Sequence, residues 1–211
     1  VGSGPAGLSA AAKLSQTGLD VLLVEQDFKP GGDYLNQETP PVKYNQLLET
    51  IKKSGVRVMT RTTAFGLYDH GTAGLLERVT DHLSNPSSAA PRQRFWTVRS
   101  KHTILATGAL ERNFVFGNND IPGIMTAASA KAYLYRFGIL PGKKIIISTN
   151  NNSAYEVSFA LANAGASVNL LDARATLPSE LSNAAKEYGV NVRKSTAALK
   201  ACGAKSVSRL E

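Results

Sequence analysis

A glycine-rich loop opens the chain and limits its fold more than any other feature. Gly2, Gly4 and Gly7 have the G-x-G-x-x-G spacing. In a strand–loop–helix unit the first glycine permits a tight turn, the second leaves room for a pyrophosphate, and the third lets the helix pack close to the sheet. The helix N-terminus then offers free N–H groups to the phosphate charge. Pro5 suits the first turn of that helix, because its missing N–H is not needed there.

An acidic residue follows this loop at the spacing of a dinucleotide-binding unit. Residues 5–19 predict a helix that Gly18 ends, and the apolar run 21–25 predicts a buried strand. Glu25 ends that strand 18 residues after Gly7, where about 20 is usual. A carboxylate there accepts hydrogen bonds from an adenosine ribose and repels a 2′-phosphate, so the pattern favours NAD or FAD over NADP. The alternative is a glycine-rich helix start with a surface glutamate.

Helix-type and strand-type segments alternate along the rest of the chain, which is typical of a parallel α/β sheet. The sequence therefore predicts a Rossmann-like FAD/NAD(P)-binding α/β fold, with helices flanking a parallel sheet. After a loop at 28–41, the expected helices are residues 44–54, 127–137, 154–164 and 179–188, and the expected strands are residues 56–59, 64–68, 74–79, 95–99, 101–106, 144–148, 168–171 and 190–193.

Two nucleotide-binding-like domains are expected. The first spans 1–112 and includes an inserted β segment at about 60–100. Near the end of this domain an apolar run leads into Thr107 and Gly108. In flavoproteins with two dinucleotide domains this pattern closes the first domain and brings backbone near the cofactor, and we expect the small Gly108 to allow that approach. The second domain, 113–211, is incomplete. Of the strand that should precede the glycine loop only Val1 is present, and residues 206–211 stop within a strand-like run, so we expect a fragment cut at both ends.

The second domain lacks a glycine fingerprint of its own. Residues 148–154 read STNNNSA, and their Cβ atoms would obstruct a pyrophosphate. We therefore expect no ordinary NAD(P)H binding there, but a helix capped by Asn or Ser. Asp172, which ends the following strand as Glu25 does in the first domain, is interpreted as residual.

Composition excludes several other functions. The net charge of +8 comes from dispersed Lys and Arg residues, which does not indicate nucleic-acid binding. The sequence contains no run of about 20 apolar residues, so it predicts no membrane span. The lone Cys202 excludes a redox pair or a cysteine-based zinc site, and the three histidines are scattered, so no metal site is predicted. A cytoplasmic location is expected.

Several longer runs resemble one family, the alpha subunits of heterotetrameric sarcosine oxidases. The resemblance covers essentially the whole chain, and opine-oxidase-like and cyanide-forming amine oxidases are related. The runs that carry it are residues 62–70, 77–83, 106–112, 118–125 and 149–155.

This resemblance implies an oxidoreductase acting on CH–NH donors with oxygen as acceptor. The family enzyme demethylates sarcosine to glycine, makes hydrogen peroxide, and passes the methyl carbon to tetrahydrofolate or releases it as formaldehyde. NAD lies in the dinucleotide domain of the alpha chain, FAD lies in the beta chain, and FMN lies at their interface. The implied partners are the beta, gamma and delta subunits.

The resemblance also assigns residues. Gln26 and Asp27 fall beside the adenosine, and Ala64 falls where the inserted segment meets the adenine end. Family members often carry a basic residue near Asp27 and a small hydroxyl residue where this chain has Asp33. No residue is assigned to amine oxidation. The predicted cofactor-binding residues are Gly2, Gly4, Pro5, Ala6, Gly7, Glu25, Gln26, Asp27, Gly32, Asp33, Ala64, Thr107 and Gly108.

Besides a subunit of an amine or opine oxidase, which the related families suggest, two other functions remain open. One is a stand-alone FAD-dependent NAD(P)H oxidoreductase, against which the missing second fingerprint and missing redox cysteines count. The other is a scaffold whose nucleotide is purely structural. FAD is accordingly the alternative to NAD in the first domain.

Overall fold

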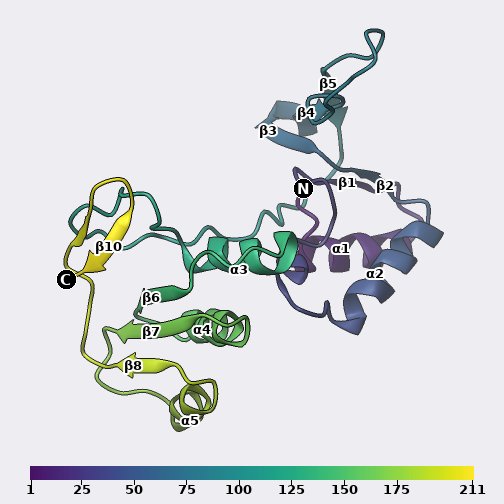
Figure 1. The fold of residues 1–211 in the computed structure, drawn as a ribbon. Coiled ribbons are helices and arrows are strands. Elements are labelled where there is room, and N and C mark those ends of the chain that lie inside the picture. The colour runs from purple at the N-terminus through teal and green to yellow at the C-terminus, as the bar shows by residue number, and fades with distance from the viewer. The chain divides into compact units, whose positions relative to one another are not determined.

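The computed structural model describes residues 1–211, which form two compact units, Val1–Ala109 and Leu110–Glu211 (Figure 1). Each unit is described by itself. Both combine β-strands with flanking helices, which confirms the predicted α/β class. None of the helices has the length and apolar character that a membrane span requires.

The first unit begins with α1 (Pro5–Ser15), β1 (Leu22–Val24), the 3-10 helix η1 (Gly32–Asn36), α2 (Val42–Lys53) and β2 (Arg57–Met59). Strands β1 and β2 pair in parallel. Helices α1 and α2 pack against this pair through buried Leu8, Leu23, Tyr44 and Ile51. Helix α1 ends at Ser15, earlier than the predicted Leu19, because turn hydrogen bonds to the Lys13 and Leu14 carbonyls close it.

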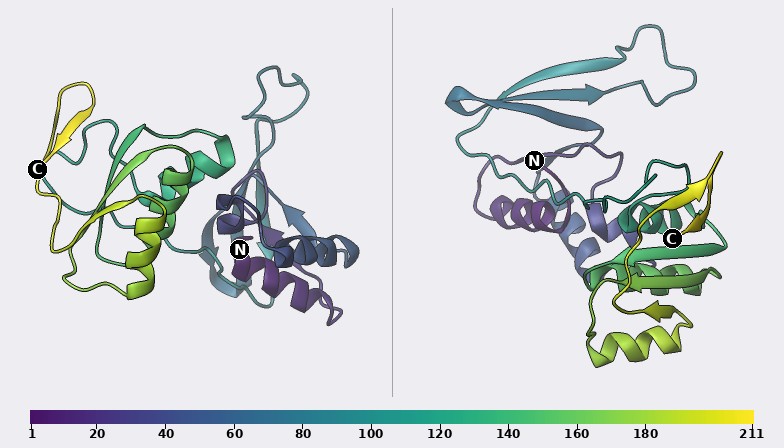
Figure 2. Two further views of the ribbon diagram at one scale, coloured as in Figure 1. Left: turned by 60° about the horizontal axis from the view of Figure 1, so that its bottom comes forward. Right: turned by 90° about the vertical axis from the view of Figure 1, so that its left-hand side faces the viewer.

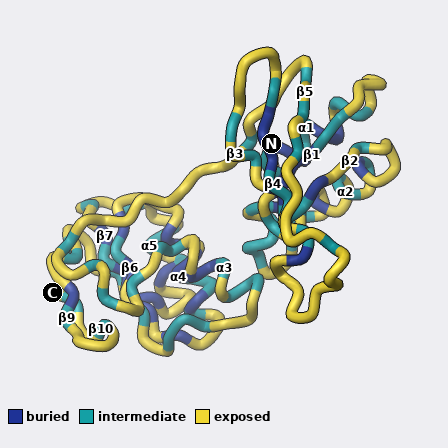
Figure 3. Tube along the Cα trace, turned by 90° about the horizontal axis from the view of Figure 1, so that it is seen from above, coloured by how far each residue is buried: buried dark blue, intermediate teal, exposed yellow.

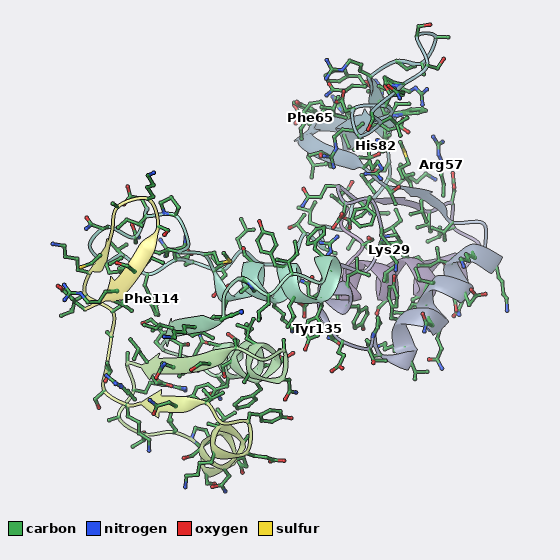
Figure 4. The ribbon with its side chains drawn as sticks, in the orientation of Figure 1. Lys29, Arg57, Phe65, His82, Phe114 and Tyr135 are labelled. Atoms are coloured by element: carbon green, nitrogen blue, oxygen red, sulfur yellow. The ribbon has the colours of Figure 1, made fainter.

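A three-stranded antiparallel sheet is inserted after β2. It consists of β3 (Thr62–Tyr68), β4 (Thr72–Arg78) and β5 (Gln93–Arg99), in the order β3-β4-β5. The turn predicted at residues 70–71 joins β3 to β4 as the short helix η2 (Asp69–Gly71). One face of the sheet covers β1 and β2 through Leu75 and Ala73. The other face carries the edge-to-face pair of Phe65 and Phe95, and Phe65 is labelled in Figure 4.

The strand predicted at 101–106 does not form. Residues 101–116 contain no regular element, and the backbone from Ile104 to Ala106 bonds only to Val1. A strand ladder needs several successive partner residues. The run from Ile104 to Ala106 pairs with the single residue Val1, so no ladder forms.

The second unit is a parallel sheet of β6 (Lys144–Thr149), β7 (Ser167–Asp172) and β8 (Asn191–Arg193), in that order. Helix α3 (Ala127–Phe137) ends at Gly138 as predicted, and α4 (Ser153–Asn163) and α5 (Ser179–Glu187) connect the strands (Figure 2). Tyr155, Leu161 and Leu170 form the centre of the core, within the segments drawn as buried in Figure 3.

A short antiparallel hairpin completes the second unit. It consists of β9 (Ala201–Gly203) and β10 (Val207–Leu210). Gly117 bridges to Lys200 beside it, and the Val207 amide donates to the Pro122 carbonyl. These contacts attach residues 117–122 to the hairpin.

Candidate functional site: the glycine loop and its acidic partner

The glycine loop joins the first residues of the unit to α1, and the protein itself requires two of its glycines. Gly2 has φ +92°, and a Cβ on it would overlap the carbonyl oxygen of Ala106. A Cβ on Gly7 would overlap the carbonyl oxygen of Gly2. These contacts give the tight turn and the close helix packing that the spacing predicts.

Gly4 differs from the other two glycines. Its φ of −68° and ψ of −171° are open to any residue, and it is the N-cap of α1. The nearest atom to a Cβ built on it is the Gly32 Cα at 4.0 Å. Neither the backbone conformation nor the protein packing excludes a side chain here. The small surface is therefore available to a ligand, at the end of α1 where N–H groups are free.

A second loop approaches the glycine loop from residues 30–33. The Gly31 amide donates to the Ser3 carbonyl at 2.9 Å. Gly32 has φ +53°, and a Cβ on it would lie 2.7 Å from the Gly4 Cα. Gly32 thus permits the close approach of the two loops, which accounts for a glycine at this position. Asp33 follows on the exposed side and accepts a hydrogen bond from Asn36 at 3.3 Å.

Glu25 is buried at the end of the first parallel strand, with 8% of its surface exposed. Its Oε2 accepts hydrogen bonds from the Ser3 amide at 2.8 Å and from the Ser3 hydroxyl at 2.6 Å. Its Oε1 accepts from the Asp27 amide at 2.8 Å. Three donors hold one carboxylate, so its position beside the glycine loop is fixed.

The structure brings most of the predicted residues together within the first unit. Pro5 and Ala6 are exposed in the first turn of α1. Thr107 follows Ala106, whose carbonyl touches Gly2, and Gly108 is exposed after it. Gln26 is exposed beyond Glu25. Ala64 lies in β3, half-buried, and packs against the apolar cluster of Val24, Met59 and Leu75.

Sequence reasoning missed two residues of this site. Ser3 stands at the variable position between two glycines. Its hydroxyl could have indicated a hydrogen-bond donor to Glu25. Arg78 ends β4, and its guanidinium donates to the Gln26 carbonyl at 2.7 Å across 52 residues of sequence. Nothing in the local sequence indicates that long-range contact.

The corresponding place in the second unit is filled by the protein's own groups. Asp172 is fully buried at the end of β7. It accepts hydrogen bonds from the Tyr155 hydroxyl at 2.8 Å, from the Arg174 amide at 2.9 Å, and from Nε and Nη2 of Arg174 at 3.0 and 2.8 Å. Each carboxylate oxygen already accepts two hydrogen bonds, so little capacity remains to accept one from a ribose hydroxyl.

Electrostatics in this cluster match its geometry. Burial alone would raise the pKa of Asp172, but hydrogen bonds from Arg174 and Tyr155 outweigh it and hold the pKa below the ordinary value of 3.8. Burial and the bond to Asp172 raise the pKa of Tyr155. The N-cap of α4 is Asn152, but its side chain makes no capping bond and accepts from Arg174 instead. The Ser153 amide donates to Oδ1 of Asn151, one residue before the cap, at 2.9 Å.

A small hollow lies at the carboxyl ends of β6 and β7. Its volume is about 220 Å³. It is lined by Phe114, labelled in Figure 4, and by Val115, Ser148, Asn150, Ala173, Ala197 and Ala198. No group of three or more His, Cys, Asp or Glu residues lies close enough to hold a metal ion.

Comparison with known sequences supports an oxidoreductase. The profile described as pyridine nucleotide-disulphide oxidoreductase matches residues 1–210. The sarcosine oxidase alpha chain of Rhizobium meliloti (strain 1021) is 38% identical over 80% of this chain and 18% of that protein. The corresponding chain of Corynebacterium sp. (strain P-1) is 37% identical over 92% of this chain and 21% of that protein. The predicted resemblance is confirmed, and the chain spans about a fifth of the length of these relatives.

More distant relatives and solved structures agree in fold. An opine oxidase subunit of Agrobacterium tumefaciens (strain Ach5) is 28% identical over 78% of this chain and 34% of that protein. L-proline dehydrogenase from P. horikoshii superposes with a TM-score of 0.66 at 21% identity, over 99% of this chain and 37% of that one. Thioredoxin reductase of T. acidophilum gives 0.70 at 13% identity, over 99% and 67%. At these identities the two structures show the fold alone, and they confirm the Rossmann-like prediction.

Proposed function

Because this chain belongs to the pyridine nucleotide-disulphide oxidoreductase family, we propose that its first unit binds the adenosine diphosphate half of NAD. The observation that carries this is Gly4. Its backbone conformation and surroundings would accept a side chain, yet the residue is a glycine, which leaves the backbone uncovered at the N-terminus of α1. A pyrophosphate there accounts for the missing Cβ.

The remaining predicted residues have defined places in this proposal. Glu25 accepts a hydroxyl of the adenosine ribose, and Gln26, Asp27 and Ala64 lie toward the adenine. The phosphates lie along Pro5, Ala6 and Gly7, with Gly32, Asp33, Thr107 and Gly108 bordering the rest of the nucleotide. When bound, a nicotinamide dinucleotide supplies hydride-transfer chemistry; the residues of this unit bind and orient it.

We extend the proposal to the protein that carries this chain. Residues 1–112 and 113–211 are its two nucleotide-binding-like domains, the second without a nucleotide. They belong to a sarcosine-oxidase-type complex with beta, gamma and delta subunits, FAD and FMN. This complex converts sarcosine to glycine, reduces oxygen to hydrogen peroxide, and passes the methyl carbon to tetrahydrofolate or releases it as formaldehyde. The resemblance to the alpha chains of sarcosine oxidases supports this. Oxidation of another N-methyl amine, but not sarcosine, by the assembled complex would exclude this substrate.

The cofactor itself is testable by mass spectrometry of the small molecule released when the purified full-length protein is denatured. NAD in amounts equal to the protein is the expected result. FAD released from this chain alone would move the protein to the stand-alone flavoprotein oxidoreductases, the alternative function.

Replacing Glu25 with glutamine should weaken selection against a 2′-phosphate. The charge that repels the phosphate is removed, and one strong acceptor for the ribose is lost. We expect the affinity for NAD to fall by about tenfold, and the preference for NAD over NADP to approach unity. Isothermal titration calorimetry with both dinucleotides measures this.

Glu38→Gln is the matched control, because Glu38 is an exposed carboxylate in the same unit. It should leave both affinities unchanged. Since Glu25 also accepts two bonds from Ser3, the variant's thermal unfolding is measured alongside. An NAD-to-NADP preference equal to that of the unaltered protein would show that Glu25 does not face the ribose.

A further inference from the structure

The turn after Glu25 is held by the inserted β-sheet. The amide of Thr62 donates to the Glu25 carbonyl at 2.8 Å, and the amide of Arg61 donates to the Asp27 carbonyl at 2.7 Å. Both donors lie where β3 begins. The sheet therefore fixes the backbone on both sides of Gln26.

Arg78 fixes the middle of the same turn from the next strand. Its Nη2 donates to the Gln26 carbonyl at 2.7 Å, and its amide donates to the Arg61 carbonyl at 2.9 Å. A bond from a guanidinium is charge-assisted and stronger than one between neutral groups. The Arg78 residue is exposed, so its head group is not required to fill the core. The bond from Arg78 to the Gln26 carbonyl therefore serves to position the turn.

The hydrogen bonds of Glu25 show why that position matters. A carboxylate oxygen accepts about two hydrogen bonds. Oε2 already accepts both donors of Ser3, whereas Oε1 accepts only the Asp27 amide among the bonds of this site. The acceptor left for a ribose hydroxyl is thus on Oε1. Its place is set by the Asp27 amide, which belongs to the turn that Arg78 holds.

We infer that Arg78 is a positioning residue for ribose recognition, acting through the Gln26 carbonyl and the Asp27 amide on Oε1 of Glu25. The inference rests on the proposed nucleotide site. It gives the inserted sheet a role in binding, because strand β4 then helps to select a nucleotide that Glu25, directly after strand β1, contacts. Arg78 itself touches neither the ribose nor the phosphates in this arrangement.

The test compares ADP with 2′-deoxy-ADP by calorimetry on the intact polypeptide that carries this sequence. The unaltered protein should prefer ADP by about tenfold, the effect of one hydrogen bond to a charged acceptor. Arg78→Ala should reduce that preference to about threefold or less, since the bond to the 2′-hydroxyl is coupled to Arg78. Arg78→Lys keeps the charge and a donor, and should retain an intermediate preference. Arg99→Ala removes an exposed arginine from β5 of the same sheet and should change nothing.

Each outcome is decisive. An ADP preference that stays at the unaltered value in Arg78→Ala overturns the inference. So does an equal loss of affinity for both nucleotides, which would indicate a general structural or electrostatic effect. If Arg78→Ala does not fold, as judged by circular dichroism, an unchanged preference in Arg78→Lys overturns it. Failure of the unaltered protein to bind ADP contradicts the proposed function instead.

Discussion

Replacing Gly4 with valine is expected to lower the affinity for NAD by about 100-fold or more while leaving the fold intact. The φ and ψ of Gly4 suit any residue, and the nearest protein atom to a Cβ is 4.0 Å away. The new side chain therefore meets no protein atom at its Cβ. It would occupy the space proposed for the pyrophosphate. Calorimetry with NAD measures the loss, and circular dichroism and thermal unfolding measure the fold.

Gly7→Ala is the contrasting variant in the same loop. Its Cβ would overlap the Gly2 carbonyl, so the helix and the loop must separate. We expect the free energy of unfolding to fall by about 3 kcal/mol or more, with binding lost as a consequence. The pair separates a ligand requirement from a packing requirement. If Gly4→Val bound NAD with unaltered affinity, no phosphate could lie against Gly4, and the proposed site would be abandoned.

Local patterns were sufficient to predict much of the fold. The glycine spacing, the apolar runs and the acid at their end depend on neighbours in sequence, so the parallel units and helix α3 were predicted close to their observed bounds. The strand at 101–106 was wrong because an apolar run does not show whether a partner strand is there to pair with it. Pairing depends on the whole sheet, which a local window of sequence does not contain.

The predicted site shows the same limit. Glu25 and the glycines could be found from spacing, but the groups that hold Glu25 could not. Ser3 acts through a hydroxyl at a position where the motif permits other residues, and Arg78 acts across 52 residues of sequence. Ala64, assigned by resemblance, is half-buried in β3 against an apolar cluster, and its place beside the adenine stays a prediction. Contacts between distant strands follow from tertiary structure alone.

The second unit uses the acid at the end of its strand differently from the first. Asp172 keeps the position at the end of its strand that Glu25 has in the first unit. Here an arginine two residues later and a tyrosine on α4 supply the hydrogen bonds. The sequence led us to interpret Asp172 as residual, whereas the structure shows that it has a structural role. The carboxylate joins β7 to α4 through the Tyr155 hydroxyl.

Replacing Asp172 with asparagine should lower the free energy of unfolding of the second unit by about 2–4 kcal/mol. The carboxylate is fully buried, and its loss leaves the Tyr155 hydroxyl and the Arg174 guanidinium without their charged acceptor. About 30% of the Arg174 side chain is exposed, so water reduces part of the cost. Thermal and urea unfolding measure the change. Asp120→Asn, at an exposed aspartate of the same unit, should change stability by no more than about 0.5 kcal/mol.

The pH dependence of the same variant identifies the charge as the cause. The pKa of Asp172 is lower in the folded protein than the ordinary value of 3.8, so the unfolded chain takes up a proton first as the pH falls. Its stabilisation is fully present above that value and is lost as the pH drops through the folded pKa. Asp172→Asn should therefore lose less stability than the unaltered protein between about pH 5 and pH 2. Parallel stability curves over this range would show that the buried carboxylate carries no charge-dependent stabilisation, and that Arg174 does not hold it in its ionised form.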